Sequence, residues 1–216
     1  MTHYHKIRIL IFILLQTPVI YIAAQNNIFK NEVYFGVNAG MTGSMVLFKP
    51  DVPQSYILGR QAGIVFRYIN EKNVGLHAEL NYSERGWSEL NRAFEKKLNY
   101  IEFPFLTHIY FGEKVRFFCN LGPKLGYLIG EQTIINIDPS STKEQHIQNI
   151  QNKFDYGIAL GLGCLFKIKR QMLQLEARGY YSANDIFANE KKDYFDNSNL
   201  IHASVTLGWL MNFNKK

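Results

Sequence analysis

The sequence predicts an all-β protein: an eight-stranded antiparallel transmembrane up-and-down β-barrel with short periplasmic turns and four long outer loops. Three observations support this fold class. Eight segments alternate apolar and polar residues, and several exceed the five or six residues of an ordinary soluble strand. Short and long connections alternate along the chain, as in outer-membrane barrels. A segment with the pattern of an export signal precedes the strands.

The first two dozen residues have the three parts of a signal peptide. Lys6 and Arg8 provide a positively charged start, the run 9–15 is apolar, and small residues follow it. A helix needs about 20 apolar residues to span a bilayer, so this short run disfavours an uncleaved membrane anchor. We therefore expect cleavage to separate a signal peptide, residues 1–24, from a barrel domain, residues 25–216, that resides in the outer membrane.

The charge and the cysteines exclude several function classes. Without the two basic residues of the signal segment, 22 basic residues face 18 acidic ones, a net charge of +4. The basic residues form no patch interleaved with aromatic residues, so a nucleic-acid partner is not expected. Cys119 and Cys164 have no metal-type spacing. Both are expected on the outward face of neighbouring strands, as two separate thiols or, if the register aligns them, as a disulfide.

Period-two alternation locates the strands. From Val74 to Tyr82 every second residue is apolar, while the residues between them are polar or small. Such a pattern indicates a strand with one apolar and one polar face. Equivalent segments predict strands at about 33–44, 59–69, 74–88, 97–111, 115–130, 153–168, 171–183 and 199–213.

The connections between these strands differ in length in a regular way. Three are tight and polar, and four are long. The tight ones are 70–73, 112–114 and 169–170, and the long ones are 45–58, 89–96, 131–152 and 184–198. Because barrel strands are antiparallel, the long connections all lie at one end, which is the outer end in outer-membrane barrels.

The outward face is predicted to be apolar, uncharged and bordered by aromatic residues. A charge facing lipid at mid-depth would cost about 2–4 kcal/mol. Tyrosines fall at the long-loop ends of the strands and mainly phenylalanines at the short-turn ends, where rings prefer the membrane interface. The two sets are Tyr82, Tyr127, Tyr156 and Tyr181, and Phe35, Tyr68, Phe111, Phe117, Phe166 and Phe213.

The inward face carries charges of both signs. An eight-stranded barrel has an interior just wide enough for its side chains, and buried charges must be paired. We therefore expect a water-poor lumen plugged by an ion-pair network rather than an open pore. The predicted members are Arg67, Glu79, Arg85, Glu102, Lys124, Glu176 and Arg178.

The last strand resembles the β-signal that the outer-membrane insertion machinery recognises. That signal has a polar residue, a glycine, a hydrophobic residue and a terminal aromatic at fixed spacing. Thr206, Gly208, Met211 and Phe213 match these positions in order, although three further residues follow the aromatic.

The mature chain also resembles the PorT-like family of small outer-membrane β-barrels from Bacteroidetes-type bacteria. The resemblance rests on Gly36–Gly40, Ala78–Gly86, Tyr100–Phe105, Asn120–Pro123 and Leu175–Arg178 with Asp185–Phe187 after it, which are specific only as a set. It implies an eight-stranded barrel in the outer membrane. Some members take part in protein secretion across that membrane, and the resemblance carries over no catalytic residue.

No pattern in the sequence indicates an enzyme. His77, His108 and His202 are expected to point inward, where Ser83 and Glu102 could be imagined beside them as a hydrolase site. Acyl transfer needs a nucleophile bonded to an oriented base, and no G-x-S-x-G motif marks such a nucleophile. The histidines lie on different strands without metal-type spacing, so neither a metal nor a cofactor is expected.

The sequence leaves three functions open. The favoured one is a non-enzymatic structural or interaction component, accessory to protein secretion or envelope assembly. Its partners would be outer-membrane lipid, the barrel-insertion machinery and secretion or envelope proteins. The alternatives are an envelope enzyme acting on lipid or peptide and a small passive porin-like channel. Apolar residues in the predicted loop 45–58 would either cover the barrel mouth or contact a partner.

Overall fold

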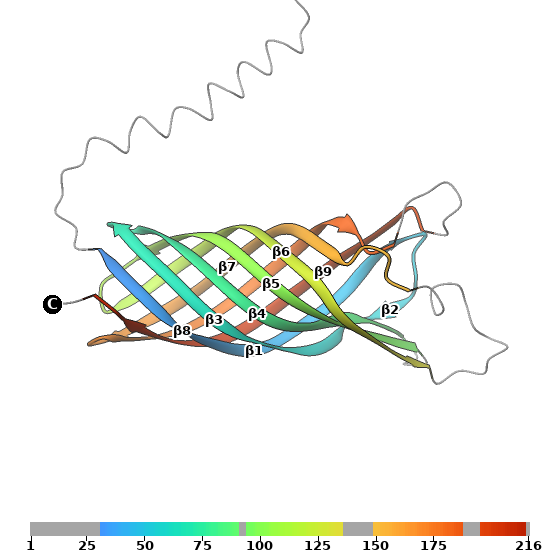
Figure 1. Cartoon of the computed structure of the whole chain (residues 1–216), viewed down its shortest axis with the longest axis horizontal. Coiled ribbons are helices and arrows are strands. Elements are labelled where there is room, and N and C mark those ends of the chain that lie inside the picture. Colours follow the sequence, from blue (N-terminus) through green and yellow to red (C-terminus); the bar gives the residue numbers. More distant parts are fainter. Residues whose placement is uncertain (1–30, 91–93, 136–148, 188–194, 215–216) are drawn as a thin grey trace, which may run out of the picture. The chain divides into compact units, whose positions relative to one another are not determined.

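The computed structural model describes residues 31–90, 94–135, 149–187 and 195–214, which form an all-β barrel (Figure 1). Among them, no helix is long and apolar enough to cross a membrane. The predicted signal peptide, residues 1–24, lies outside the described residues. The strands are β1 (Glu32–Lys49), β2 (Gln54–Ser55), β3 (Ile57–Glu71), β4 (Val74–Glu89), β5 (Phe94–Phe111), β6 (Val115–Ile135), β7 (Phe154–Ile168), β8 (Gln171–Asp185) and β9 (Asn197–Asn212).

The eight long strands close into a single antiparallel barrel. Each pairs with its neighbour in sequence, and β9 returns to pair with β1, which closes the ring. The two-residue β2 pairs only with the outer end of β4. The strands cross the barrel axis obliquely in Figure 1, which is the tilt that a closed barrel requires. The predicted fold class is confirmed.

The three tight turns are confirmed at one end of the barrel. The chain reverses between β3 and β4, between β5 and β6, and between β7 and β8. Asn73, Gly112 and Lys169 have positive φ angles, which let the backbone turn within two or three residues. At Gly112 a Cβ would lie 2.1 Å from the carbonyl oxygen of Val115, so only glycine fits this turn.

At the opposite end the strands are longer than predicted. The segment 45–58, predicted as a loop, is mostly strand, because β1 continues to Lys49 and β3 begins at Ile57. The alternation continues through this segment, with Val46 and Phe48 buried and Leu47 exposed. The β5–β6 hairpin is also extended, from Phe94 to Ile135. Apolar residues at the long-loop end therefore continue the strand pairing, where the sequence predicted loops.

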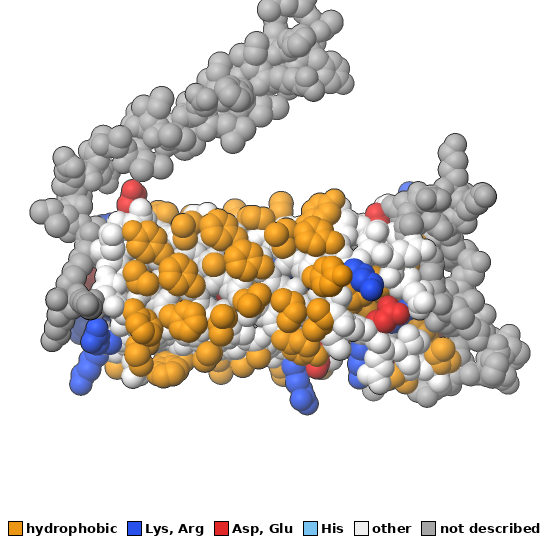
Figure 2. Space-filling model, viewed as in Figure 1, with side chains coloured by type: hydrophobic (Ala, Val, Ile, Leu, Met, Phe, Trp, Pro, Cys, Tyr) orange, Lys and Arg blue, Asp and Glu red, His pale blue; other side chains and the backbone are white. Residues whose placement is uncertain are grey.

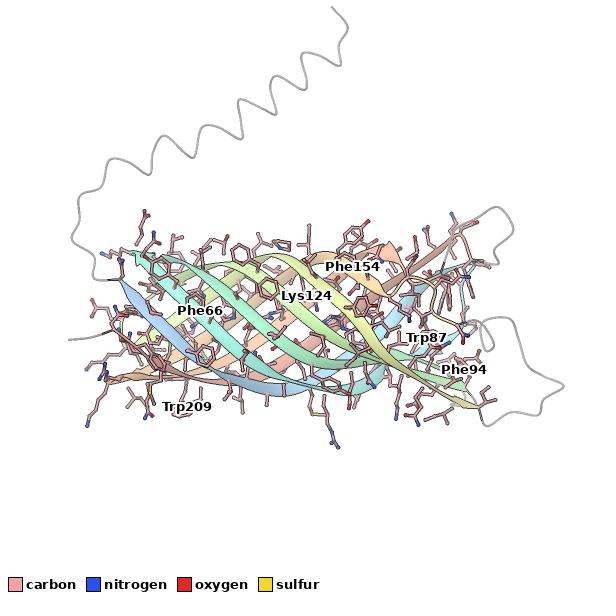
Figure 3. The ribbon with its side chains drawn as sticks, viewed as in Figure 1. Phe66, Trp87, Phe94, Lys124, Phe154 and Trp209 are labelled. Carbon is pink, nitrogen blue, oxygen red and sulfur yellow. The ribbon has the colours of Figure 1, made fainter. Side chains whose placement is uncertain are left out.

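The outward face of the barrel is apolar, as predicted. Hydrophobic side chains cover the left and middle of the visible face, and the described charged side chains lie at its left end and in its right-hand half (Figure 2). Phe66 and Trp209 project from the barrel surface (Figure 3) and are 45% and 44% exposed. In water such exposure would be costly, but against lipid tails it is favourable. The structure thus places the polar face of every long strand inside.

Candidate functional site

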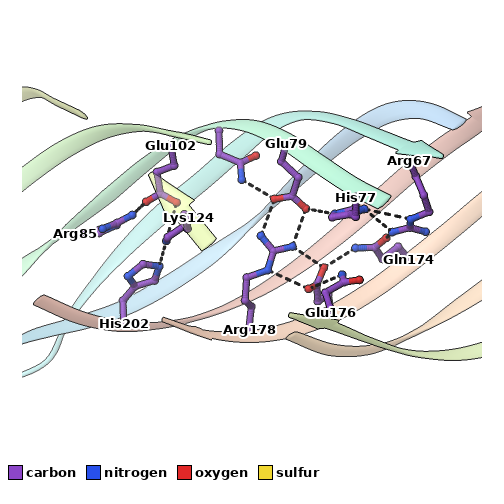
Figure 4. Close-up of polar contacts among 12 residues, drawn as sticks. Arg67, His77, Glu79, Arg85, Glu102, Lys124, Gln174, Glu176, Arg178 and His202 are labelled. Carbon is purple, nitrogen blue, oxygen red and sulfur yellow. Dashed lines mark hydrogen bonds and ion pairs between the residues drawn. The ribbon is translucent and has the colours of Figure 1, made fainter. Parts of the chain in front are cut away.

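The barrel interior holds all seven side chains that the sequence placed there. Each is at most 6% exposed, and together they come from β3, β4, β5, β6 and β8. They separate into two groups (Figure 4). Their positions along the strands place the group around Arg178 nearer the short turns and the group around Glu102 nearer the long loops. The members are Arg67, Glu79, Arg85, Glu102, Lys124, Glu176 and Arg178.

Arg178 is the centre of the group nearer the short turns. Its Nη1 and Nη2 donate to the two carboxylate oxygens of Glu79 at 2.7 Å each. Its Nη2 and Nε donate to Glu176 at 2.9 and 3.0 Å. Asn81 and His77 complete the contacts of Glu79, with His77 Nε2 2.5 Å from a carboxylate oxygen. One guanidinium therefore neutralises two buried carboxylates with directed hydrogen bonds.

Arg67 differs from its predicted role, since no carboxylate of the described residues lies within ion-pair distance of it. Its Nη2 donates to the Gln174 side-chain oxygen at 2.5 Å and lies 3.0 Å from His77 Nδ1. Gln174 in turn donates to Glu176 at 2.7 Å. Neutral side chains thus connect Arg67 to the acids through one intermediate residue.

The second group surrounds Glu102. Arg85 forms an ion pair with Glu102, and its Nη1 lies 2.9 Å from a carboxylate oxygen of Asp155. Lys124 Nζ donates to Glu102 at 3.0 Å and lies 2.8 Å from His202 Nε2. These residues project from β4, β5, β6, β7 and β9, so the group bridges most of the barrel wall.

Asp155 is a charged residue of these two groups that sequence reasoning missed, as it also missed the buried Lys96 and Arg116. Its strand was predicted to begin at 153, with Tyr156 on the outward face. Asp155 precedes Tyr156 and is therefore an inward position, so the period-two signal was present. With the histidines neutral, the acids of the two groups balance the cations. The acids are Glu79, Glu102, Asp155 and Glu176, and the cations are Arg67, Arg85, Lys124 and Arg178.

An apolar cluster, here called the mouth cluster, closes the lumen at the long-loop end. On β4 the inward position after Arg85 is Trp87, which is fully buried. Trp87 and Phe94 lie inside this end of the barrel (Figure 3). Val46 and Phe48, predicted as loop residues covering the mouth or contacting a partner, belong to it as strand residues. The cluster consists of Val46, Phe48, Trp87, Phe94, Leu98, Tyr100, Leu128, Ile150, Ile186, Phe187, Phe195 and Leu200.

The short-turn end of the lumen is also filled. Glu32 accepts a hydrogen bond from Arg116 at 2.8 Å and another from Lys167. Four apolar side chains from different strands are completely buried beside this group, namely Ile69, Leu165, Met172 and Leu210. Side chains therefore occupy the lumen from one end to the other.

Within the described residues, the three inward histidines contact side chains other than serine. His77 contacts Glu79 and Arg67, His108 contacts Asn120, and His202 contacts Lys124. None of these three described histidines bonds a serine hydroxyl. Ser182 donates instead to Asp155 at 2.6 Å and is fully buried beneath the mouth cluster. A nucleophile needs access to substrate as well as an adjacent base, and the buried Ser182 has the Asp155 carboxylate beside it but no such access.

One trio of side chains has the composition of a metal site. His77, Glu79 and Glu176 each offer a ligand atom within 4.8 Å of the others. However, Arg178 donates hydrogen bonds to both carboxylates of this trio. Its positive charge stands where a cation would bind, so the trio in this chain fits a guanidinium rather than a metal.

The insertion-signal residues lie on or beside β9. Thr206 and Gly208 point inward, whereas Met211 and Phe213 are exposed on the lipid side. Phe213 follows the last residue of β9, yet its N–H still donates to the Val33 carbonyl at 2.9 Å. The motif is therefore located on the strand that closes the barrel against β1.

The two cysteines lie on neighbouring strands but are not opposite each other. Cys119 of β6 is opposite Leu162, and Cys164 of β7 is opposite Phe117. Both are free thiols. The register thus offsets them by two residues, which agrees with the first of the two alternatives, two separate thiols.

Comparison with known proteins supports this architecture. Residues 23–188 match a family model described as outer membrane protein beta-barrel domain. No curated protein sequence matches the chain.

Three solved outer-membrane proteins illustrate the structural likeness. OprG of Pseudomonas aeruginosa is 10% identical, with a TM-score of 0.51 over 86% of this chain and 96% of OprG. Neisserial surface protein A is 14% identical, with a TM-score of 0.50 over 86% of this chain and 100% of that protein. Ail of Yersinia pestis is 13% identical, with a TM-score of 0.43 over 83% of this chain and 99% of Ail. At such identities the likeness concerns the fold alone.

Proposed function

Because the chain belongs to the outer membrane protein beta-barrel domain family, we propose that it is a closed, non-enzymatic barrel that works through contacts at its ends. The observation that carries the proposal is the filled lumen. Two charge-balanced groups occupy its middle, and the mouth cluster covers its outer end. Within the described residues, a lumen filled in this way offers neither a water path nor a substrate cleft, which leaves the ends and the lipid-facing wall of the barrel for function.

Conductance tests the closed lumen. The purified barrel, reconstituted in a planar bilayer, should give no steady single-channel current, since the charges of the lumen are already paired with each other. The passive-channel alternative predicts discrete open steps. Reproducible steps from the wild type would overturn the closed-barrel proposal.

The outer end supplies a surface for partners. The β6 strand pairs with β7 only as far as Tyr127, and the remainder to Ile135 pairs with β5 alone. Ile129 and Ile135 on this extension are 54% and 45% exposed. Both lie beyond the tyrosine border of the lipid-facing band, where exposed apolar side chains mark contact sites.

Site-specific photocrosslinking in cells tests this surface. A photoreactive residue at Ile135 should give discrete protein adducts. The same residue at Leu207, which faces lipid in the middle of β9, is the matched control and should give none. If Ile135 yields no protein adduct while the barrel is folded and present, a partner-binding outer end is wrong.

The resemblance to the PorT-like family supports a more specific role for this barrel in the cell envelope. The segments Gly36–Gly40 and Ala78–Gly86 support that kinship. The role is then an accessory one in protein secretion or envelope assembly. A deletion strain should lose secreted protein or envelope integrity and recover it with the wild-type gene. A deletion strain with normal secretion and an intact envelope would contradict this role.

The enzyme alternative has less support. Ser182 and its neighbours would need to open to the surface before lipid or peptide could reach them. The purified barrel is therefore expected to hydrolyse neither. Turnover that disappears in Ser182→Ala would replace the proposal with an enzymatic function.

A further inference from the structure

A groove of about 710 Å³ opens on the outside of the barrel, near its long-loop end. Its floor includes Gly43 of β1, Ala203 of β9 and Gly179 of β8, and Tyr56 and Tyr181 are among the residues around it. The outward side chains that line it are apolar or aromatic. The groove opens on the lipid-facing surface, and the inward-facing Ser44, Tyr180 and His202 lie beneath it in the barrel wall.

The strand register explains why the surface is hollow here. Gly43 is opposite Ala203, and Ala203 is opposite Gly179, so three small residues stand side by side on adjacent strands. The next outward row toward the loops has larger side chains, including Ile201 opposite Tyr181. Small residues in one row and large ones in the next produce a depression with a raised edge.

The glycines of the floor are not required by the backbone. At Gly179 no atom lies within 4 Å of a Cβ position, and at Gly43 the nearest is a methyl of Leu58 at 3.9 Å. Neither glycine has a positive φ. At Gly36 and Gly40, by contrast, a Cβ would lie 2.1 and 2.0 Å from a neighbouring carbonyl oxygen. The missing side chains of Gly43 and Gly179 therefore leave open space on the surface rather than relieve a clash.

A cation lies beside the groove. Arg60 on β3 is exposed and opposite Met41 of β1, the strand that contributes Gly43. Its backbone N–H donates to Glu84 at 3.1 Å, but its guanidinium forms no ion pair with any carboxylate of the described residues. Arg60 lies two residues beyond Ala62, which is opposite Tyr82 of the tyrosine border, where rings prefer the membrane interface.

We propose that this groove binds an acyl chain of a phosphate-bearing lipid of the outer leaflet, with the phosphate on Arg60. The groove is continuous with the surface that the fold places against lipid, and long loops mark the outer side of such barrels. A chain lying in the depression touches its floor and its edges, so it gains more contact than on a flat wall. An unpaired guanidinium supplies the complementary charge for the phosphate. This lipid site is independent of the partner-binding role proposed above.

Lipid retention measured by native mass spectrometry tests the site. The full barrel is released from nanodiscs that contain phosphatidylglycerol as the probe and phosphatidylcholine as the neutral comparison. Gly43→Leu with Gly179→Leu fills the groove, and the open space at both positions predicts that this variant folds. Ala39→Leu, also outward on β1 but outside the groove, is the matched control.

The wild type should retain one phosphatidylglycerol molecule. The Gly43→Leu, Gly179→Leu variant should retain about tenfold less phosphatidylglycerol than the wild type. That difference corresponds to losing contact with about two methylene groups. The Ala39→Leu control should retain as much as the wild type. Arg60→Gln should remove the preference for phosphatidylglycerol over phosphatidylcholine. Equal retention by the wild type and the filled variant, or a wild type released as a lipid-free dimer, would overturn the proposal.

A second measurement needs no variant. Phosphatidylglycerol with a photoreactive group on its chain should label wild-type peptides containing Ile158 and Ala203 in preference to the lipid-facing residues of β4 and β5. Uniform labelling around the outward face would overturn the proposal, whether or not the filled variant folds.

Discussion

Replacing Arg178 by methionine should destabilise the barrel strongly. The side chain donates two hydrogen bonds of 2.7 Å to Glu79 and two of 2.9 and 3.0 Å to Glu176. Both carboxylates are only 1% exposed, so water cannot replace these bonds. Methionine keeps most of the volume and removes the charge. The variant would thus leave two like charges buried side by side.

The expected loss is about 3–5 kcal/mol, the cost of removing one partner of a buried ion pair. Lys97→Met is the matched control, because Lys97 pairs with Glu95 at 3.1 Å on the surface, where it is 45% exposed. An exposed pair contributes at most about 1 kcal/mol. Neutralising both acids in Arg178→Met, by Glu79→Gln and Glu176→Gln, should restore much of the lost stability.

Equilibrium urea unfolding in lipid vesicles measures these differences. The two tryptophans report on different environments, since Trp87 is buried in the mouth cluster and Trp209 faces lipid. Their fluorescence should follow one transition, with the midpoint of Arg178→Met well below that of Lys97→Met. If the two substitutions cost the same, the lumen charges are solvated and the reasoning that the barrel is plugged is refuted.

Three further outcomes are expected. In Arg178→Ala, the side chains of His77, Glu79 and Glu176 should become a cation site. Zn²⁺ should then raise the urea midpoint of this variant and not that of the wild type. An unchanged midpoint would show that the three side chains do not bind a metal ion. Trp87→Ala should cost about 3–5 kcal/mol of unfolding free energy, measured as above, while the barrel stays silent in planar bilayers because the charged groups still fill it. Phe213→Ala should reduce the amount of folded barrel recovered from outer membranes but not refolding into vesicles in vitro, and equal recovery in cells would exclude an insertion signal there.

Much of the fold was predictable because a strand has a simple period. Side chains alternate across a strand, so the apolar and polar sets of Val74–Tyr82 specify its two faces without knowledge of any neighbour. The same alternation located the seven inward charges and would have located Asp155. The strand ends were less predictable, since the pattern through Val46 and Phe48 reads equally as a loop that covers the mouth.

The partners inside the barrel were not predictable from the sequence. Arg178 and Glu79 are 99 positions apart and face each other across the lumen. Arg67 was expected in an ion pair, yet its neighbours are His77 and Gln174. Alternation says which side chains point inward, but not the height at which each enters the lumen.

The order of residues along each strand was enough to predict an eight-stranded barrel with an apolar wall and a charged interior, because the two faces of a strand depend on that order alone. The folded barrel was needed to see which charges pair, that Arg178 lies between two acids, and that Gly43, Ala203 and Gly179 form one row. Those features depend on strand register and tilt, which are set by closing all eight strands together.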